Sequence, residues 1–140
     1  MKLKHMKKEN GQAMVEFALV LPILLLFIGG IIDFGWIFHN QILVNNATRE
    51  EARDIAIHYY TVKDDPDLET DTAANIKNKV GPVITSPSVS EIVAVPDGKE
   101  GYKVTVSFTG QMKVLTPILS TILGEEHTVK SVCTMRVENN

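Results

Sequence analysis

Two carboxylates border a long apolar segment near the start of the chain. Glu16 precedes sixteen uncharged residues, Phe17–Ile32, and Asp33 follows them. A carboxylate near hydrocarbon is costly when it is alone and much less so beside a cation. The chemistry that these residues offer is therefore charge pairing, and Glu16 needs a partner. For Asp33 we expect a side chain that reaches the outer membrane interface or one that pairs with another subunit.

Residue patterns typical of enzymes do not occur in the sequence. There is no GxSxG, HExxH or P-loop motif, and the four histidines stand singly: His5, His39, His58 and His127. His127 follows Glu125 and Glu126, but adjacent ligands without a third partner are weak evidence for a metal site. We therefore expect no catalytic, cofactor-binding or metal-binding residues, no cofactor and no enzyme activity.

The element that must position both carboxylates is an apolar helix. FGWIF extends the apolar run beyond Asp33, and at 1.5 Å per residue Phe17–Phe38 spans roughly 33 Å, enough for a hydrocarbon core of about 30 Å. Trp36 falls where an interfacial aromatic is expected, with its indole N–H toward water or headgroups. Pro22 removes one backbone hydrogen bond and favours a kink. We assign residues 12–38 to a transmembrane helix.

Charge is distributed unevenly along the chain. The first fifteen residues contain four lysines and one glutamate, net +3, whereas residues 39–140 contain ten Lys and Arg against fourteen Asp and Glu, net −4. The positive-inside rule then predicts a cytoplasmic N-terminus, a single pass through the cytoplasmic membrane and an extracytoplasmic domain over residues 39–140. Without a basic excess, this domain is not expected to bind nucleic acid. Cys133 is the only cysteine, so packing must hold the domain together.

The start of the apolar segment allows more than one interpretation. A removable secretory signal is disfavoured, because the run exceeds the roughly 7–15 residues of its apolar region and no A-x-A-like site follows. A plain signal anchor explains insertion but gives Glu16 no role. A basic leader that ends in Gly11, followed by QAMV, Glu16, Phe17 and a long apolar helix, resembles a class III signal cut by a prepilin peptidase.

Such a resemblance to the type IV pilin superfamily implies how this end of the chain is processed. Cleavage would fall between Gly11 and Gln12, so that residues 1–11 form a leader that is removed on the cytoplasmic face. Glu16, with Phe17 beside it, would then pair with the N-terminal amine of a neighbouring subunit during assembly. The pairing is physically reasonable, since a cation offsets the cost of a carboxylate near hydrocarbon.

Two longer blocks resemble one family in particular. AMVEFALVLPILLLFIGGIIDFGWIF followed by NNATREEARDIA is similar to the TadE-like family, minor pilins or pseudopilins of the tight-adherence (Tad, Flp) pilus. The second block departs from the family's Ala-Ala-Arg-Glu-Gly-Ala-Arg pattern at Thr48 and Glu51, which puts the close packing of that turn in doubt. It matches the pattern at Arg49, Glu50, Ala52 and Arg53. VTVSFTGQMKVLTPILSTILG and CTMRVE also resemble the family's C-terminal part.

The resemblance implies partners and a place in the cell. The partners would be a prepilin peptidase, other pilins or pseudopilins, Tad assembly-platform proteins and the lipid bilayer. The protein would take part in assembly of a type IVb-like pilus that supports adhesion and biofilm formation, and it would be a candidate for incorporation into that pilus. Two alternatives remain: an uncleaved signal-anchored envelope protein whose outer domain binds a ligand or partner, and a pseudopilin of a secretion or DNA-uptake system.

The outer domain is predicted to be α+β. The apolar positions from Val44 to Tyr59 recur at helical spacing, which extends the first helix to about residue 60, with Arg49 and Arg53 near Glu50 and Asp54 for modest ion pairs on a solvated face. TVKDDPDLETD is expected to be a solvated acidic loop without a calcium site.

A short helix and a small sheet are expected beyond this loop. Thr72–Val80 can form a helix that ends at Gly81 and Pro82. EIVAV and YKVTVSFT predict a β-hairpin, and TVKSVCTMRVE predicts a further strand with Cys133 on its apolar face. PILSTIL between them is expected to form a short apolar helix or turn, near the membrane, in a subunit contact or over the core. The predicted fold is thus a long N-terminal transmembrane helix that extends into a pilin-like domain with an antiparallel sheet of about three strands and short helices.

Overall fold

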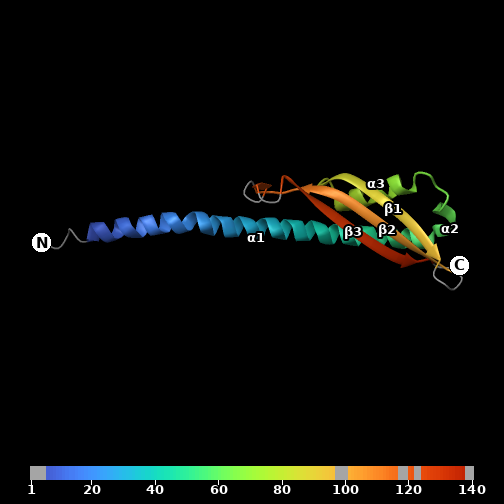
Figure 1. Ribbon diagram of the computed structural model, residues 1–140, viewed down its shortest axis with the longest axis horizontal. Helices are drawn as coiled ribbons and strands as arrows, with labels where there is room; N and C mark the ends of the chain where they lie inside the picture. Colours follow the sequence, from blue (N-terminus) through green and yellow to red (C-terminus); the bar gives the residue numbers. More distant parts are fainter. Residues whose placement is uncertain (1–5, 97–100, 117–119, 122–123, 138–140) are drawn as a thin grey trace.

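The computed structural model describes residues 6–96, 101–116, 120–121 and 124–137, with side chains described from Gly11 onward. Within these residues the chain forms one long helix, two short helices and three strands (Figure 1). The N-terminal half of the long helix projects away from the other elements, which gather along its C-terminal half (Figure 1). The apolar segment and the folded domain therefore lie largely one after the other along the molecule's longest axis.

The long helix, α1, runs over Met6–Ile57 as one element. Its 52 residues correspond to a length of roughly 78 Å at 1.5 Å per residue. The helix continues through Pro22, and no proline or glycine occurs between Gln41 and Ile57 to end it earlier. The prediction of a single N-terminal helix of about fifty residues is confirmed.

Two short helices follow, α2 at Tyr59–Val62 and α3 at Leu68–Val80. α3 begins four residues earlier than predicted, so the last part of TVKDDPDLETD is helical and the prediction of a loop there was wrong. The acidic side chains that suggested a solvated loop also favour a helix N-terminus, and Glu69 and Asp71 lie in the first turn of α3. The helix ends as expected at Gly81, whose φ of 93° suits glycine.

The sheet is an antiparallel meander of three strands in the order β1-β2-β3. β1 spans Ile84–Pro96, β2 spans Tyr102–Lys113 and β3 spans Glu126–Arg136. The predicted hairpin is confirmed, because Pro96 pairs with Tyr102; its turn at residues 97–100 lies outside the described residues. β2 pairs with β3 along its whole length, from Lys103 opposite Arg136 to Lys113 opposite Glu126.

The first part of β1 was not predicted from the sequence. Ile84–Ser90 contains Pro87 and three serines, and no element was predicted there, yet the segment pairs with β2. The register shifts between Thr85 and Ser88, and Ser86 has a φ of 49°. A bulge on an edge strand accommodates a proline that a central strand would not.

One face of the sheet is buried against the two longer helices. Alternate residues of β2, Val104, Val106 and Phe108, are buried, while Thr105 and Ser107 between them are partly exposed. Cys133 of β3 is partly buried and packs against this core, in agreement with its expected role as a small apolar side chain. The predicted alternation of the strands is confirmed.

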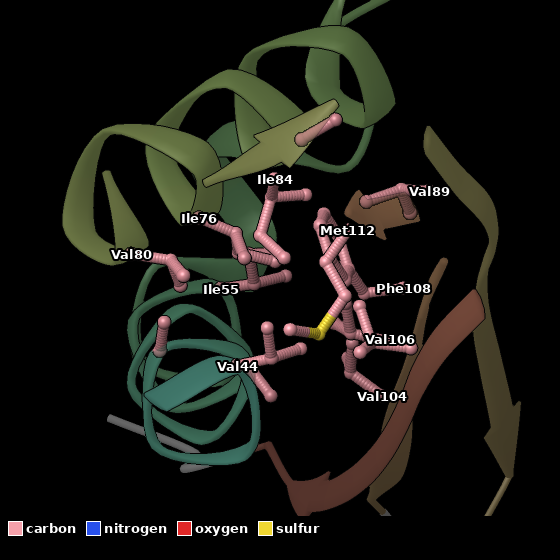
Figure 2. Close-up of a cluster of buried hydrophobic side chains, with 14 of the residues drawn as sticks. Val44, Ile55, Ile76, Val80, Ile84, Val89, Val104, Val106, Phe108 and Met112 are labelled. Atoms are coloured by element: carbon pink, nitrogen blue, oxygen red, sulfur yellow. The ribbon is translucent and has the colours of Figure 1, made fainter. Parts of the chain in front are cut away.

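The helices supply the other half of the core. α1 packs against β2 and β3, and α3 packs against β1 and α1. Figure 2 shows Val44 and Ile55 of α1 and Ile76 of α3 directed toward Val106, Phe108 and Met112 of the sheet. The stripe on the outer part of α1 is buried as predicted: Val44, Ala47, Thr48, Ala52, Ile55 and Ala56. The α+β class with a long apolar helix, short helices and a three-stranded antiparallel sheet is confirmed.

Candidate functional site

The N-terminal half of α1 is almost entirely uncovered by the rest of the described chain. Every large apolar side chain between Met14 and Ile32 is exposed. Among the described residues, α1 is the one helix that is long and apolar enough to cross a membrane, and its most apolar stretch is entirely unburied. Exposed apolar surface of this extent needs lipid or other protein around it. The length and composition of the helix suggest a membrane anchor.

The exposed apolar surface continues beyond Asp33 on one face of α1. Phe34, Phe38 and Ile42, at four-residue spacing, are all exposed, and the neighbouring turn then presents the polar side chain of Asn45. From Met14 to Ile42 the helix rises about 42 Å, which exceeds a hydrocarbon core of about 30 Å. A lightly tilted helix in lipid therefore leaves the outer end of this surface for headgroups or other subunits.

The residues of the expected cleavage and assembly site lie together at the N-terminal end of the described side chains. Gly11, Gln12, Glu16 and Phe17 are all helical and exposed. Gln12 Nε2 donates a hydrogen bond to Glu16 Oε1 at 3.4 Å, one helical turn away. Among the described side chains, Glu16 forms no ion pair within 4 Å, so its carboxylate is accessible to a cation from outside the chain.

Asp33 has a partner inside its own chain. Its side chain is buried, with 1% of the residue exposed. The backbone N–H of Thr116 donates to Asp33 Oδ1 at 3.1 Å, and the Thr116 hydroxyl donates to Oδ2. Asp33 thus pairs within its own chain, with the segment after β2, and its place at the outer membrane interface stays a prediction. The sequence showed the cost of the carboxylate but not its partner, 83 residues away.

Trp36 and Gln41 connect α1 to the sheet domain close to Asp33 along the helix, and Asn40 lies between them. Asn40 is buried and donates to the carbonyl oxygen of Trp36 at 2.8 Å, while Gln41 donates to the carbonyl oxygen of Lys130 in β3 at 2.8 Å. Trp36 Nε1 is itself buried and has no hydrogen-bond partner among the described residues. Its indole N–H does not point to solvent as expected, because Trp36 packs against the core.

A charge cluster joins α1 to α3. Lys79 Nζ lies 2.8 Å from Glu51 Oε1 and 2.9 Å from Glu50 Oε1, and Asn75 Nδ2 donates to Glu51 Oε2 at 3.4 Å. The hydrogen bond to Glu51 raises the pKa of Lys79 above its usual 10.5; burial opposes the shift and Glu50 reinforces it. The cluster was missed in the sequence because Lys79 and Glu51 are far apart along the chain.

The two arginines of the TREEAR block do not form the ion pairs expected of them. Arg49 and Arg53 are exposed, and neither has an ion pair within 4 Å among the described residues. Glu50 pairs with Lys79 instead, and Asp54 Oδ1 lies 3.3 Å from His58 Nδ1. Lys79 and His58 therefore pair with the two carboxylates that the arginines were expected to contact. The guanidinium groups of Arg49 and Arg53 are left exposed.

The two departures from the family's second block fit into the packed helix. Thr48 is fully buried, and its hydroxyl donates to the carbonyl oxygen of Val44 at 2.8 Å. Glu51, 7% exposed, is held by Lys79. Both polar side chains thus have partners where the family pattern has small residues, which answers the doubt about packing in this turn.

The described side chains contain no group of three or more His, Cys, Asp or Glu that could hold a metal ion. The outer face of α1 and the sheet offer polar surfaces. The features that demand a functional explanation are instead the bare apolar helix and its accessible Glu16.

This arrangement defines a class: a protein with one long apolar helix, which suggests a membrane anchor, and a small α+β domain built on the C-terminal half of the same helix. Within that class, residues 11–53 match the family model described as TadE-like protein, which confirms the resemblance drawn from the two N-terminal blocks. The matched segment begins at Gly11 and ends at Arg53, and it includes Glu16 and Asp33. The resemblance of the C-terminal strands lies outside it and stays a prediction. The chain matches no curated protein and no solved structure.

Proposed function

We propose that this protein is a minor pilin or pseudopilin that takes part in assembling a tight-adherence (Tad/Flp, type IVb-like) pilus, and thereby supports adhesion and biofilm formation. The observation that carries the proposal is the bare apolar helix with an accessible Glu16 one turn beyond Gly11–Gln12, in a segment that matches TadE-like proteins. That family is structural and non-enzymatic, in keeping with a role in packing rather than catalysis.

The chain is made as a precursor with its N-terminus in the cytoplasm and residues 39–140 outside. A prepilin peptidase cuts between Gly11 and Gln12, and the apolar helix keeps the mature protein in the cytoplasmic membrane. Platform proteins of the Tad system then bring it beside other pilins or pseudopilins. The excess length of the apolar surface over a bilayer supports this step, since helices of like subunits can cover what lipid leaves exposed.

Glu16 provides the specificity of assembly in this mechanism. Its carboxylate accepts the N-terminal amine of a neighbouring processed subunit, which offsets the cost of a charge near hydrocarbon. Because the amine exists at this position only after cleavage, unprocessed chains cannot form the pair.

The experiment is the intact mass and N-terminal sequence of membrane-extracted protein, produced with and without a prepilin peptidase. Gly11→Ala is the test variant, and the structure leaves room for it because an added Cβ would meet nothing within 4 Å. Gly30→Ala is the matched control, with equally free space in the same helix.

A new N-terminus at Gln12 that is lost in Gly11→Ala and kept in Gly30→Ala is the expected result. An unprocessed chain in all cases, with the peptidase active on a control substrate, would reject the pilin-type precursor. It would favour the uncleaved signal anchor with a partner-binding outer domain.

A further inference from the structure

Thr116, three residues beyond the end of β2, lies against the apolar part of α1. Thr116 is bonded to Asp33 through its backbone N–H and its hydroxyl. At Gly29, one turn closer to the N-terminus, an added Cβ would lie 3.9 Å from Thr116 Cγ2. Figure 1 shows the end of β2 and the start of β3 directed back toward the N-terminal half of α1. Thr116 thus lies beside the same part of α1 as Gly29 and Asp33, at the end of the helix's apolar stretch.

The Asp33–Thr116 contact fixes this position. Asp33 is 1% exposed, so each carboxylate oxygen depends on its protein donor rather than on water. A hydrogen bond to a charged group is stronger than one between neutral groups, and its loss leaves a buried group unsatisfied. The segment that carries Thr116 is therefore held at a fixed position along the axis of α1. The depth of α1 in a bilayer then also sets the depth of this segment.

The position of the apolar stretch along α1 indicates the depth at which Asp33 and Thr116 would lie in a bilayer. A hydrocarbon core of about 30 Å takes about 20 helical residues, and Met14–Asp33 is a stretch of that length following the charged N-terminal residues. In this register Asp33 and Thr116 lie at the outer edge of the hydrocarbon, and Gly29 lies about 6 Å inside it. If the core begins later, at Phe17, or the helix tilts, Thr116 lies deeper still.

The side chains around Thr116 have the order that a membrane interface favours. Leu115, next to Thr116, is 53% exposed although it is apolar. Lys113 and Glu126, which are register partners at the adjoining ends of β2 and β3, are exposed and charged. Leu115 would then contact hydrocarbon, while Lys113 and Glu126 would lie at the level of the headgroups. There the lysine can meet lipid phosphate.

We propose that the segment directly after β2, at Leu115 and Thr116, is a second membrane contact of this protein, inserted into the outer leaflet and held at its depth by the Asp33–Thr116 contact. The inference rests on the membrane anchoring in the proposed function, but not on cleavage or pilus assembly. The outer domain is thereby docked to the bilayer at two places, which fixes its orientation over the membrane.

Single labelled cysteines test this depth in the full-length chain. In a Cys133→Ser background, Leu115→Cys, Phe27→Cys and Val132→Cys are labelled with an environment-sensitive nitrobenzoxadiazole dye. The proteins are reconstituted into phosphatidylcholine–phosphatidylglycerol vesicles with or without acyl-chain nitroxide lipids. Phe27 lies in the anchor and Val132 on the far face of β3; both are exposed in the structure, so all three positions accept a label.

We expect strong quenching at positions 27 and 115 and at least threefold weaker quenching at position 132. Quenching at 27 alone would overturn the second contact while leaving the anchor intact, and the absence of quenching at 27 would reject the anchoring on which the inference rests. If position 115 is shielded only at high protein-to-lipid ratio, its partner is another protein and the lipid proposal fails.

The role of Asp33 and Thr116 is tested with Thr116→Val in the same background. This variant removes the hydroxyl donor and keeps the side-chain shape, and Thr128→Val at an exposed position of β3 is the control. We expect quenching at position 115 to fall at least twofold in Thr116→Val, with quenching at 27 unchanged. Equal quenching in both variants would show that the Thr116 hydroxyl does not set the depth, and would overturn that part of the proposal.

Discussion

The ammonium nitrogen of Lys79 lies 2.8 Å from Oε1 of Glu51, and this contact joins α3 to the long helix. Glu51 is 7% exposed and lies among buried alanines of α1, so its charge has little access to water. Lys79 therefore has a structural role beyond that of an exposed surface lysine. It compensates a carboxylate at the point where the long helix α1 joins the core of the α+β domain.

Lys79→Met should lower the free energy of unfolding of the full-length chain in detergent micelles by about 1 kcal/mol. The estimate is modest because the lysine itself is partly exposed, but Glu51 is left buried without its cation. The measurement is a denaturant titration followed by circular dichroism. Lys77→Met in the same helix is the control, since Lys77 has no ion pair within 4 Å among the described residues, and it should leave the value within about 0.5 kcal/mol.

The effect of Lys79 should also depend on pH. Its pKa is raised above 10.5 in the folded protein, so the stabilisation is fully present below the unfolded pKa and is lost as the pH rises through the folded pKa. The difference between wild type and Lys79→Met is therefore expected to be constant from neutral pH to about pH 10 and to shrink above 10.5. A difference that grows with pH would contradict the assignment.

Local patterns predicted the elements of the fold but few of the contacts between them. The alternation of Val104, Val106 and Phe108 and the helical spacing from Val44 to Ala56 each depend on neighbours in sequence, and both predictions are confirmed. The partners of Asp33 and Glu51 could not be predicted in this way. Thr116 and Lys79 become neighbours only after the chain has folded back on α1, and short-range periodicity carries no information about that.

The errors have a similar origin. No strand was predicted over Ile84–Ser90, which contains Pro87 and three serines, but pairing with β2 overrides the local preference of these residues at a bulged edge. Arg49 and Arg53 were expected to pair along the helix, yet Lys79 of α3 pairs with Glu50 instead. The site around Gly11 and Glu16 was predicted from a short, contiguous motif, and it stays a prediction.

Gly110 should be intolerant of any side chain. A methyl group there would lie 2.5 Å from Ile84 Cγ2 and 3.3 Å from Phe108 Cε1, and both neighbours are buried in the core. Gly110→Ala is therefore expected to cost about 1–3 kcal/mol of unfolding free energy through overpacking. Gly35→Ala, where the added methyl meets nothing within 4 Å, should leave stability equal or slightly higher. Equal stability of the two variants in the same denaturant titration would argue against close packing of β1 on β2.

A pair of isoleucine substitutions should separate the folded core from the anchor. Ile76 is fully buried between α3 and the sheet, whereas Ile31 is 73% exposed on the apolar half of α1. Ile76→Ala should destabilise the chain in micelles by about 2–5 kcal/mol, because it leaves a cavity. Ile31→Ala should change the unfolding free energy by less than about 0.5 kcal/mol. A large loss from Ile31→Ala would mean that the anchor contributes to the packed core.

The two carboxylates of the apolar helix should give opposite results when each is replaced by alanine. Asp33→Ala leaves the Thr116 donors without their buried acceptor and should cost about 1–3 kcal/mol of unfolding free energy. Unfolding can be followed by the fluorescence of Trp36, three residues away. Glu16→Ala removes an exposed side chain whose hydrogen bond to Gln12 is long, so stability and membrane insertion should stay unchanged. Pilus number, counted by electron microscopy in cells that lack the wild-type chain, should nevertheless fall sharply in Glu16→Ala. Normal piliation in that variant would contradict the proposed pairing of Glu16 with a neighbouring amine, because assembly would then proceed without the carboxylate that accepts the amine.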